Sequence, residues 1–266
     1  MSRIAGTFAT LRQNSQGALI SFIEAFDPDY ATSLALLQGM AENGADVIEI
    51  GMPFTDPMAD GPTVQAAGRR GLQAGATLKG VLTLVREFRQ HNHHTPLVLM
   101  GYLNPILSYG IKDFCQDATQ AGIDGVIIVD LPPEEADLVL PHANANGLDV
   151  IRLVAPTTSD ARLRQVLSGS SGFVYYVSIT GVTGTRTASA ADLARDIPRI
   201  RAATDLPIAV GFGIRTPEQA ATAVAHADAA VVASALIDTL CKENAAAVLR
   251  DVKALADGIR QARKVS

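Results

Sequence analysis

The chain has 266 residues, a hydrophobic fraction of 48% and a formal net charge of −5. This length fits one α/β barrel or two smaller domains, and the negative charge, with no Lys/Arg cluster, argues against a nucleic acid or an anionic membrane as partner. No apolar run approaches the roughly 18 residues that span a bilayer, so we expect a small-molecule ligand.

The cysteines and the first residues indicate a reducing compartment. Cys115 and Cys241 lie far apart and match no metal-binding or redox spacing. The segment Met-Ser-Arg-Ile-Ala-Gly at the start lacks the pattern of a secretory signal. We therefore expect a cytoplasmic location and no metal site.

Short β-rich runs alternate with amphipathic, Ala-rich stretches along the whole chain. We expect strands at 18–25, 47–52, 97–102, 125–130, 150–155, 173–179, 208–212 and 229–233. We expect helices at 30–43, 63–74, 78–91, 105–121, 134–146, 160–168, 190–203, 217–226 and 245–263, and an extra helix at 2–14. Near-continuously apolar strands are typical of parallel strands that are covered on both faces. Eight βα units predict a single (β/α)₈ TIM barrel over residues 1–266, with a doubly wound open sheet as the alternative.

In such a barrel, the loops that follow the strands form the catalytic face. Polar residues at or after predicted strand ends are Asp56, Asp60, Asn104, Asp130, Thr183 and Ser234. The histidines His91, His93 and His94 precede a strand instead, so they belong to the opposite, stabilising face. We read them as a solvated helix end rather than as a metal site.

Glu49 and Asp60 are the candidates for acid–base chemistry. Strand alternation places Glu49 on one face with Val47 and Gly51, among apolar neighbours. Burial of an unpaired carboxylate is unfavourable, so this is a position for a catalytic acid with a raised pKa, although a structural Glu with a polar partner is the alternative. Asp60 lies in the Pro/Gly-rich loop that follows, and two carboxyl groups in different environments can divide acid and base roles.

Three turns rich in small residues follow consecutive predicted strands. They are Gly181-Val-Thr-Gly184, Gly211-Phe-Gly-Ile214 and Ala233-Ser-Ala235. Exposed backbone N–H groups at such turns bind anions, and the loops after strands 7 and 8 are a recurrent phosphate site of this fold. These turns predict a phosphorylated substrate, although glycines in tight turns alone would also explain them.

Apolar and aromatic side chains on the strands could hold a flat apolar group near the same rim, although ordinary barrel packing would also place them there. They are Phe22, Met100, Tyr102, Ile127, Val129, Leu153, Tyr175 and Phe212.

The segment Ile48-Glu-Ile-Gly-Met-Pro-Phe-Thr-Asp-Pro-Met-Ala-Asp-Gly-Pro62 resembles the signature of the α subunits of tryptophan synthase almost throughout. Further matches are Tyr102-Leu-Asn-Pro105, Asp130-Leu-Pro-Pro133, Tyr175 with Ser178, and the turns at Gly181–Gly184 and Gly211–Gly213. The resemblance covers essentially the whole chain. The first segment is highly specific, whereas glycine turns are shared with many phosphate-binding barrels.

The resemblance implies retro-aldol cleavage of indole-3-glycerol phosphate to indole and glyceraldehyde 3-phosphate. Glu49 resembles the general acid and base of the family, and Asp60 resembles the residue that binds the indole N–H. Among substrate-binding residues, Tyr175 resembles the tyrosine that lines the site near Glu49, and Phe22, Ile127 and Phe212 resemble the indole pocket. Tyr102, in a further matching motif, is also implied to bind the substrate. The phosphate anchor is implied for Thr183, Gly184, Gly213, Ala233 and Ser234.

The resemblance also implies that this subunit holds no cofactor. A β subunit carrying pyridoxal phosphate would receive indole in an α₂β₂ assembly, and the loop at Pro53–Pro57 would meet that partner. A phosphosugar isomerase-type barrel is the alternative enzyme, and a catalytically weak α subunit that acts mainly on its β partner is a third possibility.

The end of the first strand departs from the family pattern. Where the family usually reads Thr-Ala-Gly-Asp-Pro, this chain has Glu24-Ala-Phe-Asp-Pro28, and Ser21 replaces a usual Pro. Ala233 stands where Gly is common. Because alternation places Glu24 on the face of Phe22, we expect Glu24 to lie close to Glu49 and to titrate with it as a coupled pair. The alternative is that the first strand ends before residue 24 and that this side chain reaches solvent.

Overall fold

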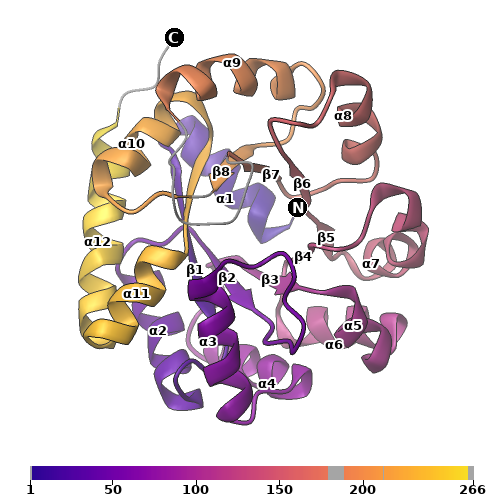
Figure 1. The fold of residues 1–266 in the computed structure, drawn as a ribbon, viewed down its shortest axis with the longest axis vertical. Coiled ribbons are helices and arrows are strands. Elements are labelled where there is room, and N and C mark those ends of the chain that lie inside the picture. Colours follow the sequence, from indigo (N-terminus) through magenta and orange to yellow (C-terminus); the bar gives the residue numbers. More distant parts are fainter. Residues whose placement is uncertain (1, 179–188, 212, 263–266) are drawn as a thin grey trace.

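A closed barrel of parallel strands surrounded by helices forms the protein (Figure 1). The computed structural model describes residues 2–178, 189–211 and 213–262. The strands in these residues are β1 (Ala18–Glu24), β2 (Val47–Gly51), β3 (Leu97–Gly101), β4 (Gly125–Ile128), β5 (Asp149–Val150), β6 (Arg152–Val154), β7 (Val174–Val177), β8 (Ile208–Gly211) and β9 (Ala229–Val232). Their order is β5-β4-β3-β2-β1-β9-β8-β7-β6, with every adjacent pair parallel.

The barrel is eight-stranded in effect, as the sequence predicts. Ile151 alone separates β5 from β6, and these two pieces pair with β4 and β7 respectively. They therefore form one interrupted strand at the place of the predicted strand 150–155, and this strand closes the ring. The prediction of a (β/α)₈ barrel is confirmed.

The helices of the described residues cover the outside of the barrel and one of its ends (Figure 1). They are α1 (Arg3–Gln13), α2 (Tyr30–Glu42), α3 (Pro62–Gln73), α4 (Leu78–Arg89), α5 (Leu103–Tyr109), α6 (Ile111–Ala121), the 3₁₀ helix η1 (Pro133–Leu138), α7 (Leu140–Asn146), α8 (Asp160–Leu167), α9 (Ala190–Arg201), α10 (Pro217–His226), α11 (Ser234–Lys242) and α12 (Ala245–Gln261).

Two of the helix predictions need correction, and one helix was missed. The predicted helix 105–121 is broken at Gly110. This residue has a φ of +95°, a backbone conformation that glycine adopts readily and that is strained for other residues. The predicted helix 134–146 is broken before α7, where Pro141 cannot donate a backbone hydrogen bond. Helix α11 was not predicted at all, and it begins directly after β9.

The N-terminal helix α1 closes one end of the barrel. Its buried residues Ile4, Phe8 and Leu11 pack into the interior cluster that includes Ile151 and Phe173. The rings of Phe8 and Phe173 have centroids 5.9 Å apart. Because α1 fills the end where the strands begin, a cavity inside the barrel opens toward the carboxyl ends of the strands. The extra helix of the prediction is confirmed.

The His91–His94 segment lies at this closed end, as predicted. Arg3 Nε, on α1, donates a 2.9 Å hydrogen bond to the carbonyl oxygen of His93. The side chains of His91, His93 and His94 are all exposed, and they take no part in the catalytic face.

The turn after β1 contains an unusual backbone conformation at Phe26. This residue has a φ of +63°, in the left-handed region that favours glycine. Its ring is buried and lies against Tyr30, with centroids 5.2 Å apart and an angle of 77° between the rings. Gly80 leaves room for the ring, since a Cβ there would lie 2.9 Å from Phe26 Cζ. The packing of the Phe26 ring thus offsets the unfavourable left-handed backbone conformation of this residue.

We expect Phe26→Gly to be more stable than Phe26→Ala, the reverse of the usual order of these residues. Both variants lose the buried ring, which costs about 3–5 kcal/mol, but only glycine relieves the left-handed strain of about 1–2 kcal/mol. Urea unfolding of the two variants and the wild type measures this difference. An alanine variant at least as stable as the glycine variant would contradict the strain at this position.

Candidate active site

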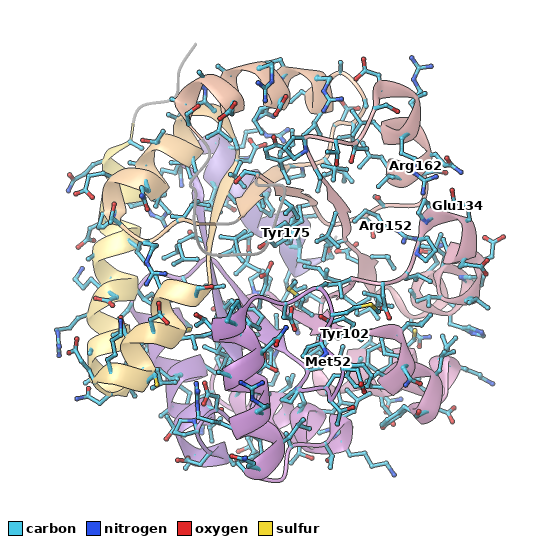
Figure 2. All side chains as sticks on the ribbon, in the orientation of Figure 1. Met52, Tyr102, Glu134, Arg152, Arg162 and Tyr175 are labelled. Carbon is cyan, nitrogen blue, oxygen red and sulfur yellow. The ribbon has the colours of Figure 1, made fainter. Side chains whose placement is uncertain are left out.

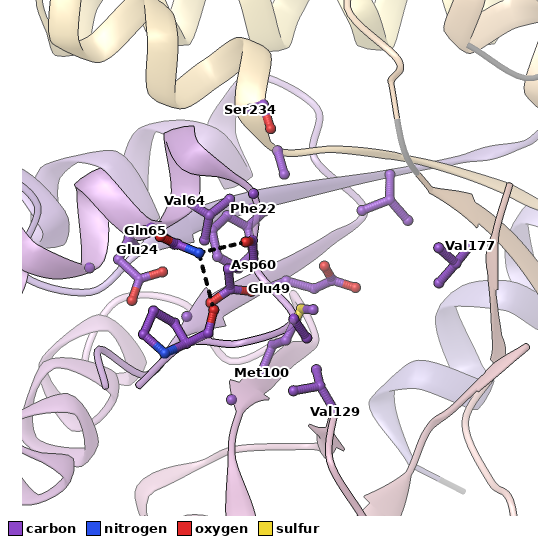
Figure 3. A pocket seen from close by; sticks show the side chains of 18 of the residues that line it. Phe22, Glu24, Glu49, Asp60, Val64, Gln65, Met100, Val129, Val177 and Ser234 are labelled. Carbon is purple, nitrogen blue, oxygen red and sulfur yellow. Dashed lines mark hydrogen bonds between the residues drawn. The ribbon is translucent and has the colours of Figure 1, made fainter. Parts of the chain in front are cut away.

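A cavity of about 360 Å³ lies at the carboxyl ends of the strands. Figure 3 shows it from close by, and Figure 2 shows Tyr102 and Tyr175 inside the ring of helices. The residues predicted from the sequence that line it are Phe22, Glu49, Asp60, Met100, Tyr102, Val129, Leu153, Tyr175, Gly213, Ala233 and Ser234. These side chains come from strands and loops that are far apart in the sequence, and barrel closure brings them together.

Glu49 is buried in the middle of β2, as the alternation of that strand predicts. Its side chain is 1% exposed, and neither carboxyl oxygen has a hydrogen-bond partner among the described residues. Burial raises the pKa of Glu49 from its ordinary value of 4.5 to about 8. The group is therefore mostly protonated at pH 7, and it is available to give its proton to a ligand.

Tyr175 of β7 lies near Glu49 and depends on a neighbouring glycine. Burial, and to a smaller extent the charge of Glu49, raises the pKa of the Tyr175 hydroxyl well above its ordinary value. Gly211 of β8 leaves room for this ring, because a Cβ at that position would overlap the Tyr175 hydroxyl. Tyr175 therefore stays neutral and keeps one side of the Glu49 site dry.

Asp60 lies in the loop after β2, which two side chains hold in place. Gln65 Nε2 donates hydrogen bonds to the carbonyl oxygens of Asp60, at 2.9 Å, and of Pro57, at 3.4 Å (Figure 3). The hydroxyl of Tyr102 accepts a 3.0 Å hydrogen bond from the N–H of Ala59 and donates to the carboxylate of Asp60. The carboxyl group thus has a defined position although it lies on a loop.

The pKa of Asp60 differs from that of Glu49 because the two environments differ. Burial raises the pKa of Asp60 from 3.8 to about 6, and the hydrogen bond from Tyr102 limits the increase. At pH 7 most of the Asp60 population is therefore charged, whereas most of the Glu49 population is neutral. Such a separation assigns different roles to two carboxyl groups in one cavity.

Two predictions about this cavity are wrong. Ile127 does not line it but is fully buried in the barrel interior, and Val129, two residues farther along the same face, takes its place. Glu24 is not coupled to Glu49: the acids that raise its pKa are Asp60 and Asp27, and the pKa of Glu49 is raised by burial. In Figure 3, Glu24 and Glu49 lie on opposite sides of Asp60.

The far end of the cavity is lined by three residues of the predicted phosphate turns. Gly213 has a φ of +77°, and Ala233 and Ser234 stand at the beginning of α11. The first N–H groups of a helix have no acceptor within the helix, so they favour an anion. The predicted residues Thr183, Gly184 and Phe212 lie outside the described residues.

Sequence reasoning missed several residues of this site. Val64 and Gln65 of α3 and Arg215 after β8 also line the cavity. The position of Gln65, shortly after Pro62 at the start of a helix, is a signal that could have indicated its contact with the preceding loop. The start of α11 was missed because its first residues, Ser234 and Ala235, were interpreted as part of a turn after the last strand.

Neither a metal cluster nor a membrane helix is found in the part of the chain that the structure describes. No group of three His, Cys, Asp or Glu side chains there could hold a metal ion. None of the helices in these residues has the length and apolar character needed to cross a membrane.

The fold and the cavity define a (β/α)₈-barrel enzyme that uses acid–base chemistry at the carboxyl ends of its strands. The family model described as tryptophan synthase alpha chain matches residues 8–264. The chain belongs to this family.

Individual relatives agree with the family assignment. A tryptophan synthase alpha chain from Acidiphilium cryptum is 66% identical over 276 residues, which cover 100% of each chain. The crystal structure of tryptophan synthase subunit alpha from Legionella pneumophila superposes with a TM-score of 0.91 at 38% identity, covering 97% of this chain and 98% of the other. A chain from the structure of Mycobacterium tuberculosis tryptophan synthase has a TM-score of 0.89 at 35% identity, with coverage of 97% and 98%.

The pKa of Glu49 predicts how Glu49→Gln changes stability with pH. Between about pH 4.5 and 8 the unfolded chain loses this proton while the folded chain keeps it, so wild-type stability falls as pH rises through this range. The glutamine variant lacks this loss. We expect it to match the wild type near pH 4 and to exceed it by up to ~4 kcal/mol at pH 9.

Urea unfolding at both pH values measures this difference. Asp56→Asn, which removes an exposed carboxyl group from the loop after β2, is the matched control. An equal stability difference at pH 4 and pH 9 would show that folding does not raise the pKa of Glu49.

Proposed function

We propose that this chain cleaves indole-3-glycerol phosphate to indole and glyceraldehyde 3-phosphate, with Glu49 as general acid and base and Asp60 as the charged group. Membership of the family makes the chain a lyase, the α subunit of tryptophan synthase, which acts in tryptophan biosynthesis. The observation that supports these roles is the presence of one neutral and one charged carboxyl group in a single cavity.

The reaction divides into steps that these two groups can perform. Glu49 gives its proton to C3 of the indole ring, and the positive charge that develops on the ring nitrogen is stabilised by the carboxylate of Asp60. The carboxylate of Glu49 then takes the proton of the side-chain hydroxyl. As the carbon–carbon bond breaks, its electrons return to the ring, which leaves indole, an aldehyde and protonated Glu49.

The remaining cavity residues would orient the substrate. Phe22, Val129 and Leu153 offer apolar surface for the ring, and the turn at Gly213 and the start of α11 at Ser234 would hold the phosphate. These acid–base steps need no cofactor in this chain. Pyridoxal phosphate is proposed only for a β partner.

Glu49→Gln tests the mechanism directly. The amide keeps the size of the side chain but cannot transfer a proton, so we expect indole release from indole-3-glycerol phosphate to fall on the order of 10²–10⁴-fold. Indole release by the purified variant and the wild type is the measurement. Asp56→Asn, in the same loop region but exposed, is expected to keep most of the activity of the isolated chain.

Three outcomes would count against the proposal or change it. More than a tenth of wild-type turnover in the glutamine variant would remove Glu49 from the mechanism. A wild type that releases no indole, alone or with a β subunit, would favour a phosphosugar isomerase. Turnover that is detectable only with the β subunit would favour a weak α subunit that acts mainly on its partner.

We also propose that the rim formed by the loops after β2, β3 and β4 binds a β subunit in an α₂β₂ assembly. The exposed large apolar side chains of the described residues gather there: Met58 is 77% exposed, Leu107 of α5 is 49% and Leu138 of η1 is 44%. They follow three consecutive strands, so they share one end of the barrel. Exposed apolar groups of this kind mark protein interfaces.

Replacement of two of these side chains is expected to weaken the assembly. We expect Met58→Ser with Leu107→Ser to raise the dissociation constant for the β subunit at least tenfold, since about 1.4 kcal/mol of apolar burial suffices for this. Sedimentation of mixed subunits measures it. His91→Ala, at the closed end of the barrel, is the control, and unchanged assembly of the double variant would place the interface elsewhere.

A further inference from the structure

A second buried carboxyl group, that of Glu24, faces the cavity and has no part in the proposed reaction. Glu24 ends β1, is 6% exposed and lines the cavity. Figure 3 shows its carboxyl group near Gln65, on the side of Asp60 away from Glu49. Its carboxyl group has no hydrogen-bond partner among the described residues.

The surrounding backbone forms a niche for this carboxyl group. A Cβ at Gly51 would overlap Glu24 Oε2 and would lie 2.7 Å from Cζ of Phe22, so the carboxyl group lies close to the edge of the Phe22 ring. A Cβ at Gly68 would lie 3.6 Å from the other oxygen. Two glycines on different elements, β2 and α3, thus leave the space that Glu24 occupies.

The surroundings of Glu24 favour its neutral, protonated form over its charged form. Burial raises its pKa well above 4.5, and the charges of Asp60 and Asp27 raise it further. Arg70, which could have balanced a charge here, is held by Asp27 through hydrogen bonds of 2.6 and 2.8 Å. The neutral group has one O–H donor and one carbonyl acceptor, and a buried polar group without a partner is unfavourable.

We propose that Glu24 determines specificity at the ring end of the cavity by hydrogen-bonding a hydroxyl group on the six-membered ring of the substrate. The ligand class is hydroxylated indoles and the corresponding glycerol phosphates. This inference rests on the proposed function, which places the indole ring beside Asp60 and Phe22. A neutral carboxyl group can both donate a hydrogen bond to a hydroxyl group and accept one from it. A site that hydrogen-bonds a hydroxyl group of its ligand discriminates against ligands that lack this group.

Equilibrium binding of indole and of each hydroxyindole with its hydroxyl on the six-membered ring tests the inference. The proteins compared are the wild type, Glu24→Gln, which keeps a donor and an acceptor at similar size, and Glu24→Met, which fills similar space without them. For each protein, the affinity for a hydroxyindole is divided by the affinity for indole. For at least one isomer, we expect this ratio to be on the order of fivefold higher in the wild type and the glutamine variant than in the methionine variant.

The same affinity ratios in all three proteins would overturn the inference. A ratio lost equally in the glutamine and methionine variants would also overturn it, because packing and not hydrogen bonding would then be the cause. The test is separate from that of the proposed function. If indole itself does not bind the wild type, the proposed function fails, whereas unchanged ratios with normal indole binding defeat only the role of Glu24.

Discussion

The unpaired carboxyl group of Glu49, buried inside a closed barrel, is the constraint on which the rest of the site depends. Its raised pKa exists only while water is kept away from its oxygens. The apolar strands on both sides, the ring of Tyr175 and the plug formed by α1 maintain this exclusion. The fold therefore stabilises a group that is unfavourable by itself, and the same unfavourable environment makes the group an acid at neutral pH.

Asp60 shows how a loop can supply the opposite protonation state a short distance away. It is less buried than Glu49, and it accepts a hydrogen bond from Tyr102. That hydrogen bond favours the charged form, while Gln65 fixes the backbone of the loop. A rigid strand thus carries the neutral acid, and a loop tied to a helix and to a strand end carries the charge. The same loop carries Met58, which is exposed at the rim.

The end of β1 shows that two unusual residues can be accommodated where neighbouring glycines leave room for their side chains. Phe26 keeps a left-handed backbone because its ring packs on Tyr30 beside Gly80. Glu24 fits because Gly51 and Gly68 leave room for its carboxyl group. Local rules are broken at both positions, and Glu24 lines the cavity, as is common near functional sites.

The sequence by itself determined the barrel, the order of its elements and the face of each strand, because periods of two and 3.6 residues follow from backbone geometry alone. It correctly placed Glu49 inside and Asp60 at the rim. It did not determine how high a side chain lies in the barrel, so both Ile127 and Val129 were placed near the cavity, and only Val129 lines it. Nor did it show that Asp60 and not Glu49 is the acid that acts on Glu24. Strand tilt, stagger and loop path set these neighbours, and they exist only once the barrel has closed.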